Sequence, residues 1–172
     1  MKTLLSAWQQ QRPETILTGI GEPGLLDGLL TAFFASRQCP GTAIHAAMDW
    51  VMQQTKTKAT VISGFHSPLE RSALEILLTA KSPAVVVLAR DVAKASLPPE
   101  WTDALQAGRL AVISAAHEAQ TVRLTDARAH QRNEIAASLA QKIVIAHTSP
   151  AGKLAKQVEQ WREAGRIIQM LG

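Results

Sequence analysis

The sequence lacks the residues and runs on which several large classes of protein depend. It contains a single cysteine, Cys39, so no disulfide can form within the chain, and this fits a reducing compartment. No stretch approaches the roughly 20 apolar residues that a membrane-spanning helix needs. The first residues also lack the apolar region and cleavage site of a secretory signal. We therefore expect a soluble, cytoplasmic protein.

Signatures of common cofactor and metal sites are missing as well. There is no G-x-x-x-x-G-K-[ST] phosphate loop, and the segment GIGEPG at residues 19–24 has the G-x-G-x-x-G spacing without a long strand before it. Pro23 there favours a turn and a short helix. The histidines do not have the spacing of metal ligands; they are His45, His66, His117, His130 and His147. We expect no cofactor and no metal.

What is present is the composition of a globular domain. The 172 residues are 47% hydrophobic and 19% charged, and this length suits one domain rather than two. The net charge is +4, with 18 Lys and Arg against 14 acidic residues and no block of like charge. This balance permits an anionic partner without demonstrating one.

Short apolar runs alternate with stretches of helical spacing. The runs that predict strands lie at residues 29–35, 59–63, 84–89, 110–114 and 142–147. The helical stretches lie at residues 43–54, 69–80, 99–107, 131–140 and 152–164. Strands that are apolar on both faces and alternate with helices predict a Rossmann-like α/β sandwich with a mostly parallel central sheet. We expect a further edge strand at residues 16–18, a last strand at residues 166–169, and a surface loop over residues 115–130.

Small, polar and basic residues follow three of the expected strands. In a parallel sheet the ligand crevice lies beyond the carboxyl ends of the strands, so these residues should meet at one edge. They are Ser36, Arg37 and Gly41 after the first strand, Ser63 and Gly64 after the second, and Gly152 and Lys153 after the last. Such turns make good phosphate sites, although each one alone also fits an ordinary tight turn. Gly64 should either adopt a positive φ or let a ligand approach the backbone.

Arg132 and Asn133 stand where we expect a helix to begin. A cation near a helix N-terminus is unfavourable unless an anion shares the site, so we expect Arg132 at the same sheet edge as Ser36, Arg37 and Gly64. Asn133 fits a helix cap as well as a ligand contact. Glu70 has the pattern of a solvated carboxylate on a helix surface, and no set of side chains predicts catalysis.

Several segments together resemble one known family. TAFFASRQCPG (31–41), TVISGFHSPLERSALEILL (60–78), AVVVLA (84–89) and HQRNEIAASLAQKIVIAHTSPAGKLAKQVEQWREAGRII (130–168) are similar, in this order, to segments of the DNA-processing protein A (DprA/Smf) family. The resemblance extends over about residues 16–168. The positions that match the family's motifs are Ser36, Arg37, Gly41, Ser63, Gly64, Arg132, Asn133 and Gly152. Departures include Ala35 and Pro68, which stand where the family has glycine.

The resemblance implies a Rossmann-like domain that binds single-stranded DNA in a basic pocket at the strand ends and helps to load recombinase during natural transformation. We therefore expect non-catalytic binding of single-stranded DNA or another nucleic-acid phosphate backbone by a single domain, with a homodimer among the expected assemblies. A nucleotide sensor, a nucleotide-cleaving enzyme and a scaffold that binds only protein remain alternatives. The glycine pair and the spaced glutamate of nucleotide hydrolases of the cytokinin-activating type are absent from SPAGKLAKQVEQ at residues 149–160.

Overall fold

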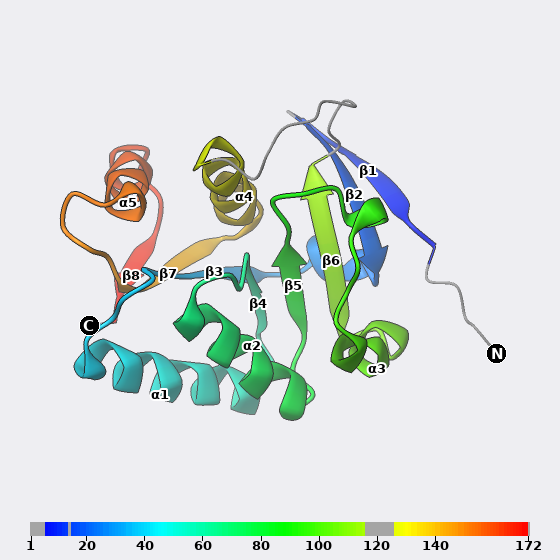
Figure 1. Cartoon of the computed structure of the whole chain (residues 1–172), viewed down its shortest axis with the longest axis horizontal. Helices are drawn as coiled ribbons and strands as arrows, with labels where there is room; N and C mark the ends of the chain where they lie inside the picture. Colours follow the sequence, from blue (N-terminus) through cyan, green and yellow to red (C-terminus); the bar gives the residue numbers. More distant parts are fainter. Residues whose placement is uncertain (1–5, 14, 116–125, 172) are drawn as a thin grey trace.

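The computed structural model describes residues 6–13, 15–115 and 126–171, which form one eight-stranded sheet covered by helices (Figure 1). The strands are β1 (Trp8–Arg12), β2 (Thr15–Gly21), β3 (Leu30–Ala35), β4 (Thr60–Ser63), β5 (Ala84–Val87), β6 (Leu110–Ala115), β7 (Lys142–His147) and β8 (Ile168–Met170). The α-helices are α1 (Gly41–Thr57), α2 (Pro68–Thr79), α3 (Thr102–Gln106), α4 (Asp126–Leu139) and α5 (Lys153–Glu163). Three 3-10 helices, η1 (Pro23–Asp27), η2 (Val92–Lys94) and η3 (Pro99–Trp101), complete the described elements.

The sheet has the strand order β1-β2-β6-β5-β4-β3-β7-β8. Strands β3 to β8 are all parallel, whereas β2 is antiparallel to both β1 and β6. The chain moves outward from β3 through β4 and β5 to β6, and then returns to place β7 on the other side of β3. The expected Rossmann-like fold is confirmed, and its order reverses between β3 and β7, where open α/β sheets bind their ligands.

Alternate residues of each central strand pack against the two helical layers. Helices α1, α2 and α3 cover one face of the sheet, and α4 and α5 cover the other (Figure 1). Phe33 stacks on Trp50 of α1 with ring centroids 5.2 Å apart, while its neighbour Phe34 packs on Trp161 of α5 at 5.0 Å. Burial on both faces explains why the parallel strands are continuous apolar runs rather than alternating patterns.

The expectations at the N-terminal side need correction. Strand β1 was not foreseen, and it takes the edge position that we expected for residues 16–18; β2 is longer than expected and lies between β1 and β6. The first three residues of GIGEPG belong to the antiparallel strand β2, and the segment continues into η1 rather than into a βαβ unit. Among the described residues, no helix is long and apolar enough to cross a membrane.

Helix α4 begins earlier than the apolar pattern indicates. Residues 126–130, expected as part of a surface loop, are helical, and the remainder of that loop, residues 116–125 with Arg123, lies outside the described residues. Arg128 is therefore a helical residue, and its Nη1 donates to the Ala89 carbonyl oxygen at 3.5 Å. Arg132 and Asn133 lie well inside α4. Our expectation that they begin a helix and share its free N–H groups is wrong. The sequence did not indicate the true start of α4, because the polar residues there show no apolar period.

Candidate functional site

A pocket of about 270 Å³ opens at the sheet edge where β3 and β7 end. Residues of four separate segments line it: the β3–α1 turn, the β4–α2 turn with the start of α2, helix α4, and the β7–α5 turn with the start of α5. We call it the strand-end pocket. Its lining consists of Ala35, Ser36, Arg37, His66, Ser67, Glu70, Arg132, Asn133, Ser149, Gly152, Lys153 and Leu154.

The strand-end pocket collects most of the residues that the sequence singled out. Those that line it are Ser36, Arg37, Arg132, Asn133, Gly152 and Lys153. Arg132 lies at the same sheet edge as Ser36 and Arg37, as we expected. Three expected residues do not line the pocket: Gly41 is exposed at the first position of α1, Ser63 is buried, and Gly64 lies beneath Arg132.

The two serines at strand ends hold turns in place. Ser36 Oγ accepts a hydrogen bond from the Ser149 N–H at 3.0 Å, and the Ser36 N–H donates to the His147 carbonyl oxygen at 3.0 Å. The turns after β3 and β7 are thereby joined across the point where the strand order reverses. The buried Ser63 Oγ accepts from the Phe65 N–H at 3.0 Å, and it thus satisfies a donor in the β4–α2 turn.

Gly64 has a role that differs from the one expected. The positive φ in this turn belongs to Phe65, at 47°, and not to Gly64. A Cβ at position 64 would lie 2.5 Å from Arg132 Nε and 2.7 Å from Arg132 Cδ. The missing side chain of Gly64 therefore makes the space in which the Arg132 side chain lies against the β4–α2 turn.

Glu70 is a buried residue of the site, and our interpretation of it as a solvated carboxylate is wrong. Only 6% of the residue is exposed. Its Oε2 accepts from the Ala35 N–H at 2.9 Å, and its Oε1 accepts from the His66 N–H at 2.9 Å and the Ser67 N–H at 3.3 Å. One carboxylate thus fastens the end of β3 to the turn that precedes α2.

A local sequence signal for this arrangement exists in the segment Ser67-Pro68-Leu69-Glu70. It is a capping box, in which the Ser67 hydroxyl accepts from the Glu70 N–H while the Glu70 side chain accepts from the Ser67 N–H. Pro68 occupies the first position of α2, where an N–H has no partner within the helix. The proline that replaces a family glycine is therefore compatible with the start of this helix.

Burial, together with neighbouring charges, shifts three pKa values at the strand-end pocket. Burial raises the pKa of Glu70, while the three backbone N–H donors and the positive charge of Arg132 oppose the rise. Burial lowers the pKa of Arg132, and Glu70 opposes this. The pKa of His66 falls through burial and then through the positive charges of Arg132, Arg71 and Arg37. The environment of His66 is thus positive, as a site for an anion must be.

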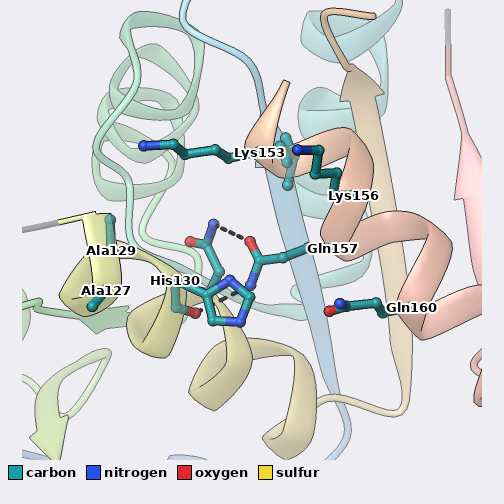
Figure 2. Close-up of a pocket in the computed structure, with 9 residues that line it drawn as sticks. Ala127, Ala129, His130, Lys153, Lys156, Gln157 and Gln160 are labelled. Carbon is teal, nitrogen blue, oxygen red and sulfur yellow. Dashed lines mark hydrogen bonds between the residues drawn. The ribbon is translucent and has the colours of Figure 1, made fainter. Parts of the chain in front are cut away.

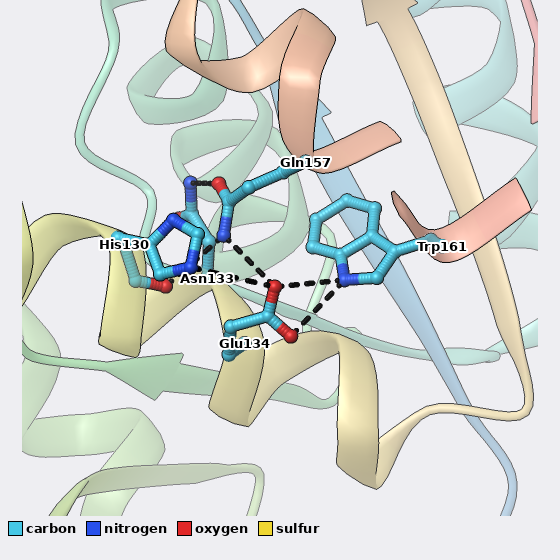
Figure 3. A network of polar contacts seen from close by, with 5 residues as sticks. All are labelled: His130, Asn133, Glu134, Gln157 and Trp161. Atoms are coloured by element: carbon cyan, nitrogen blue, oxygen red, sulfur yellow. Dashed lines mark hydrogen bonds and ion pairs between the residues drawn. The ribbon is translucent and has the colours of Figure 1, made fainter. Parts of the chain in front are cut away.

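A network of polar contacts joins α4 to α5 (Figure 3), and Arg132 bonds to one of its members, Asn133. Asn133 Oδ1 accepts from Arg132 Nε and Nη2, each at 3.4 Å, and Asn133 Nδ2 donates to Gln157 Oε1 at 3.0 Å. Gln157 Nε2 and Trp161 Nε1 in turn donate to the Glu134 carboxylate at 3.1 Å and 3.0 Å. Asn133 therefore links the arginine to the interface of two helices rather than capping a helix.

Comparison with known proteins connects this chain to one family. The family model described as DNA recombination-mediator protein A matches residues 3–170. A comparison with curated protein sequences found no significant match.

Among solved structures, DNA processing protein A (DprA) from Streptococcus pneumoniae matches with a TM-score of 0.70 and 18% identity, over 90% of this chain and 54% of that one. The chain thus spans about half of the pneumococcal protein. DNA processing protein A from Helicobacter pylori matches with a TM-score of 0.75 and 13% identity, over 99% of this chain and 82% of that one. Its structure is described as giving insights into its single-stranded DNA binding mode. A molybdenum cofactor carrier protein from Chlamydomonas reinhardtii matches more weakly, with a TM-score of 0.56 and 12% identity, over 83% of this chain and 76% of that one. These likenesses show a shared fold.

Proposed function

Because the chain belongs to the DNA recombination-mediator protein A family, we propose that it binds single-stranded DNA and that the strand-end pocket holds the phosphate backbone without cleaving it. The single-stranded DNA binding described for the Helicobacter pylori relative supports the choice of ligand. The role in DNA processing or recombination follows from the family, and the position of the DNA is our proposal.

The observation that carries this proposal is the convergence of Arg37, Arg132 and Lys153 on one pocket from three different segments. Arginine presents a planar fork of N–H donors that suits phosphate, and lysine adds a compact positive charge. The one carboxylate in the lining, Glu70, directs both oxygens to backbone N–H groups. Its negative charge is therefore partly compensated within the protein by these backbone donors.

The size of the pocket supports a polymer as the ligand. Small-molecule sites usually enclose about 300–1,000 Å³, and the strand-end pocket, at about 270 Å³, is smaller than this. It has room for a phosphate and part of a nucleotide, whereas the remainder of the ligand must lie outside. A DNA strand that passes over the pocket meets this condition.

The experiment that tests the proposal measures the affinity for single-stranded DNA at several salt concentrations. Each lost phosphate contact makes the slope of log K against log salt shallower by about 0.7 for a single strand. We expect Arg37→Ala to flatten the slope by about this amount and to weaken binding by about 1.5–3 kcal/mol, the range for hydrogen bonds to charged groups. The matched control is Arg162→Ala, because Arg162 is exposed near the end of α5 and pairs only with Glu159 among the contacts described for it, at 3.0 Å.

A panel of mononucleotides, tested as competitors, separates the two main alternatives. If mononucleotides displace the DNA completely and salt has no effect on affinity, the protein is a nucleotide sensor and the proposal is wrong. Release of a free base from any of these ligands would instead reveal a nucleotide-cleaving enzyme.

We also propose that the protein acts as one domain and binds DNA as a homodimer. The single sheet formed by the described residues supports one domain. For the dimer, the support is that β8 pairs only with β7 in the described sheet, with Ile167 and Met170 exposed beside its open edge. Light scattering with and without DNA tests this, and a monomeric mass in both states would contradict it.

A further inference from the structure

A second pocket, of about 360 Å³, lies between α4 and α5 (Figure 2). We call it the interhelical slot. It adjoins the strand-end pocket, since Asn133, Lys153 and Leu154 line both. The two pockets therefore lie side by side at the first turn of α5.

The lining of the interhelical slot differs from that of the strand-end pocket. Ala127 and Ala129 of α4 face Leu154 of α5 across it and provide aliphatic walls. Two of the three amides in its lining are bonded to protein groups: Asn133 Nδ2 donates to Gln157 Oε1 at 3.0 Å, and Gln157 Nε2 donates to the His130 carbonyl oxygen at 3.1 Å. The interior of the slot therefore suits a flat, mostly apolar group better than a phosphate.

Charged and polar side chains stand at the rim of the slot. Lys153 and Lys156 both project from the first turn of α5, and Figure 2 shows them on the same side of Gln157, with the His130 ring at the opposite side. Both lysines are exposed. An apolar interior with cations at its edge is complementary to a nucleotide in which the base enters and the phosphates stay outside.

We propose that the interhelical slot binds a base of the same single-stranded DNA whose backbone lies in the strand-end pocket. The inference rests on the proposed function and adds a direction to it: the strand leaves the strand-end pocket over the start of α5, not over α1. Lys156 then contacts a phosphate next to the bound base. Sequence preference is weak, since the slot presents aliphatic walls to the base and two of its three amides are already bonded to the protein.

The first test needs no variant. A short thymidine oligonucleotide is compared with a series in which one abasic site is moved along the strand. We expect one position, or two adjacent positions, at which the missing base weakens binding about tenfold, close to the lower end of the range for stacking of one base. A series in which every position has the same affinity would overturn the proposal.

The second test locates the base. Ala129→Leu adds a side chain to the wall of the slot, and we expect it to weaken binding of the intact oligonucleotide about tenfold and to abolish the difference between intact and abasic DNA. Ala46→Leu on α1 is the matched control and should keep the wild-type difference. Retention of the full abasic effect in folded Ala129→Leu would place the base elsewhere and refute the slot.

Two lysine-to-alanine variants test the direction of the DNA strand, and neither of them adds a side chain to the slot. Lys156→Ala should weaken binding and flatten the salt dependence by about one phosphate contact, whereas Lys56→Ala, which removes the same charge near the end of α1, should not. Equal effects of the two variants would contradict the path over α5. If wild-type protein fails to bind intact DNA at all, the proposed function fails; if DNA binds and only these slot tests are negative, the slot alone is wrong.

Discussion

Gly64→Ala is the smallest change that tests whether the Arg132 side chain must lie where the structure places it. The new Cβ would stand 2.5 Å from Arg132 Nε, whereas ordinary contacts of a Cβ begin at 3.4 Å. The Arg132 side chain must therefore move by nearly one ångström or take another rotamer. Since φ at residue 64 is not in the positive range, the backbone itself accepts alanine.

The expected magnitudes separate binding from stability. Displacement of Arg132 from a phosphate should cost about 1.5–3 kcal/mol, which is about a 10- to 150-fold loss of affinity for single-stranded DNA. The free energy of unfolding should change little, because a glycine-to-alanine change in a compatible backbone stabilises by about 0.4–1 kcal/mol through the unfolded chain. This gain offsets part of the strain that the new Cβ creates against the flexible Arg132 side chain.

The assay is fluorescence anisotropy with a labelled oligonucleotide, alongside thermal unfolding. Gly41→Ala is the matched control, since a Cβ at position 41 meets nothing within 4 Å, and it should bind as the wild type does. In an Arg132→Ala background, Gly64→Ala should add no further loss, because the two positions act through one side chain. Full affinity in Gly64→Ala, or additive losses in the double variant, would refute the reasoning.

Three further predictions follow from the buried and hydrogen-bonded groups. Glu70→Gln replaces one accepting oxygen by an amide and should lower the free energy of unfolding by about 1–3 kcal/mol in urea titrations, whereas the exposed Glu75→Gln should not; equal stabilities would exclude Glu70 as the link between β3 and α2. The lowered pKa of His66 means that its neutral form is favoured on folding, so its contribution to stability is present above pH 6.5 and is lost as the pH falls through the folded-state pKa. A DNA phosphate beside His66 should raise that pKa, which NMR titration of the imidazole measures; an unchanged pKa in the complex would place the phosphate elsewhere. Asn133→Ala removes the acceptor of the Arg132 hydrogen bonds and should weaken DNA binding less than Arg132→Ala does; a greater loss would mean that Asn133 acts independently of the arginine.

The central strands were predictable because burial on both faces leaves a simple signal. Segments such as AVVVLA at residues 84–89 are apolar throughout, and their alternation with helices determines a parallel sheet. The start of α4 and strand β1 were not predictable in this way. Helix α4 begins with polar residues that show no apolar period, and β1, WQQQR, is a polar edge strand whose place depends on its pairing with β2.

The residues of the candidate site likewise divide into those that the sequence predicts and those that it does not. Ser36, Arg37 and Lys153 were found because the topology of a parallel sheet brings the ends of its strands together. The burial of Glu70 was not predicted, although its capping box is visible in the sequence. The reason is that Glu70 accepts a hydrogen bond from the Ala35 N–H, which belongs to a strand 35 residues earlier. The position of Arg132 over Gly64 likewise depends on how α4 packs, which no local pattern encodes.

The central claim is that the phosphate backbone of single-stranded DNA lies in the strand-end pocket. The most direct test is NMR observation of the arginine Nε–Hε signals during titration with a short single-stranded oligonucleotide. We predict that the signals of Arg37 and Arg132 shift as the complex forms, while those of Arg109 and Arg162 keep their positions. Saturable DNA binding that leaves the Arg37 and Arg132 signals unmoved would contradict the account.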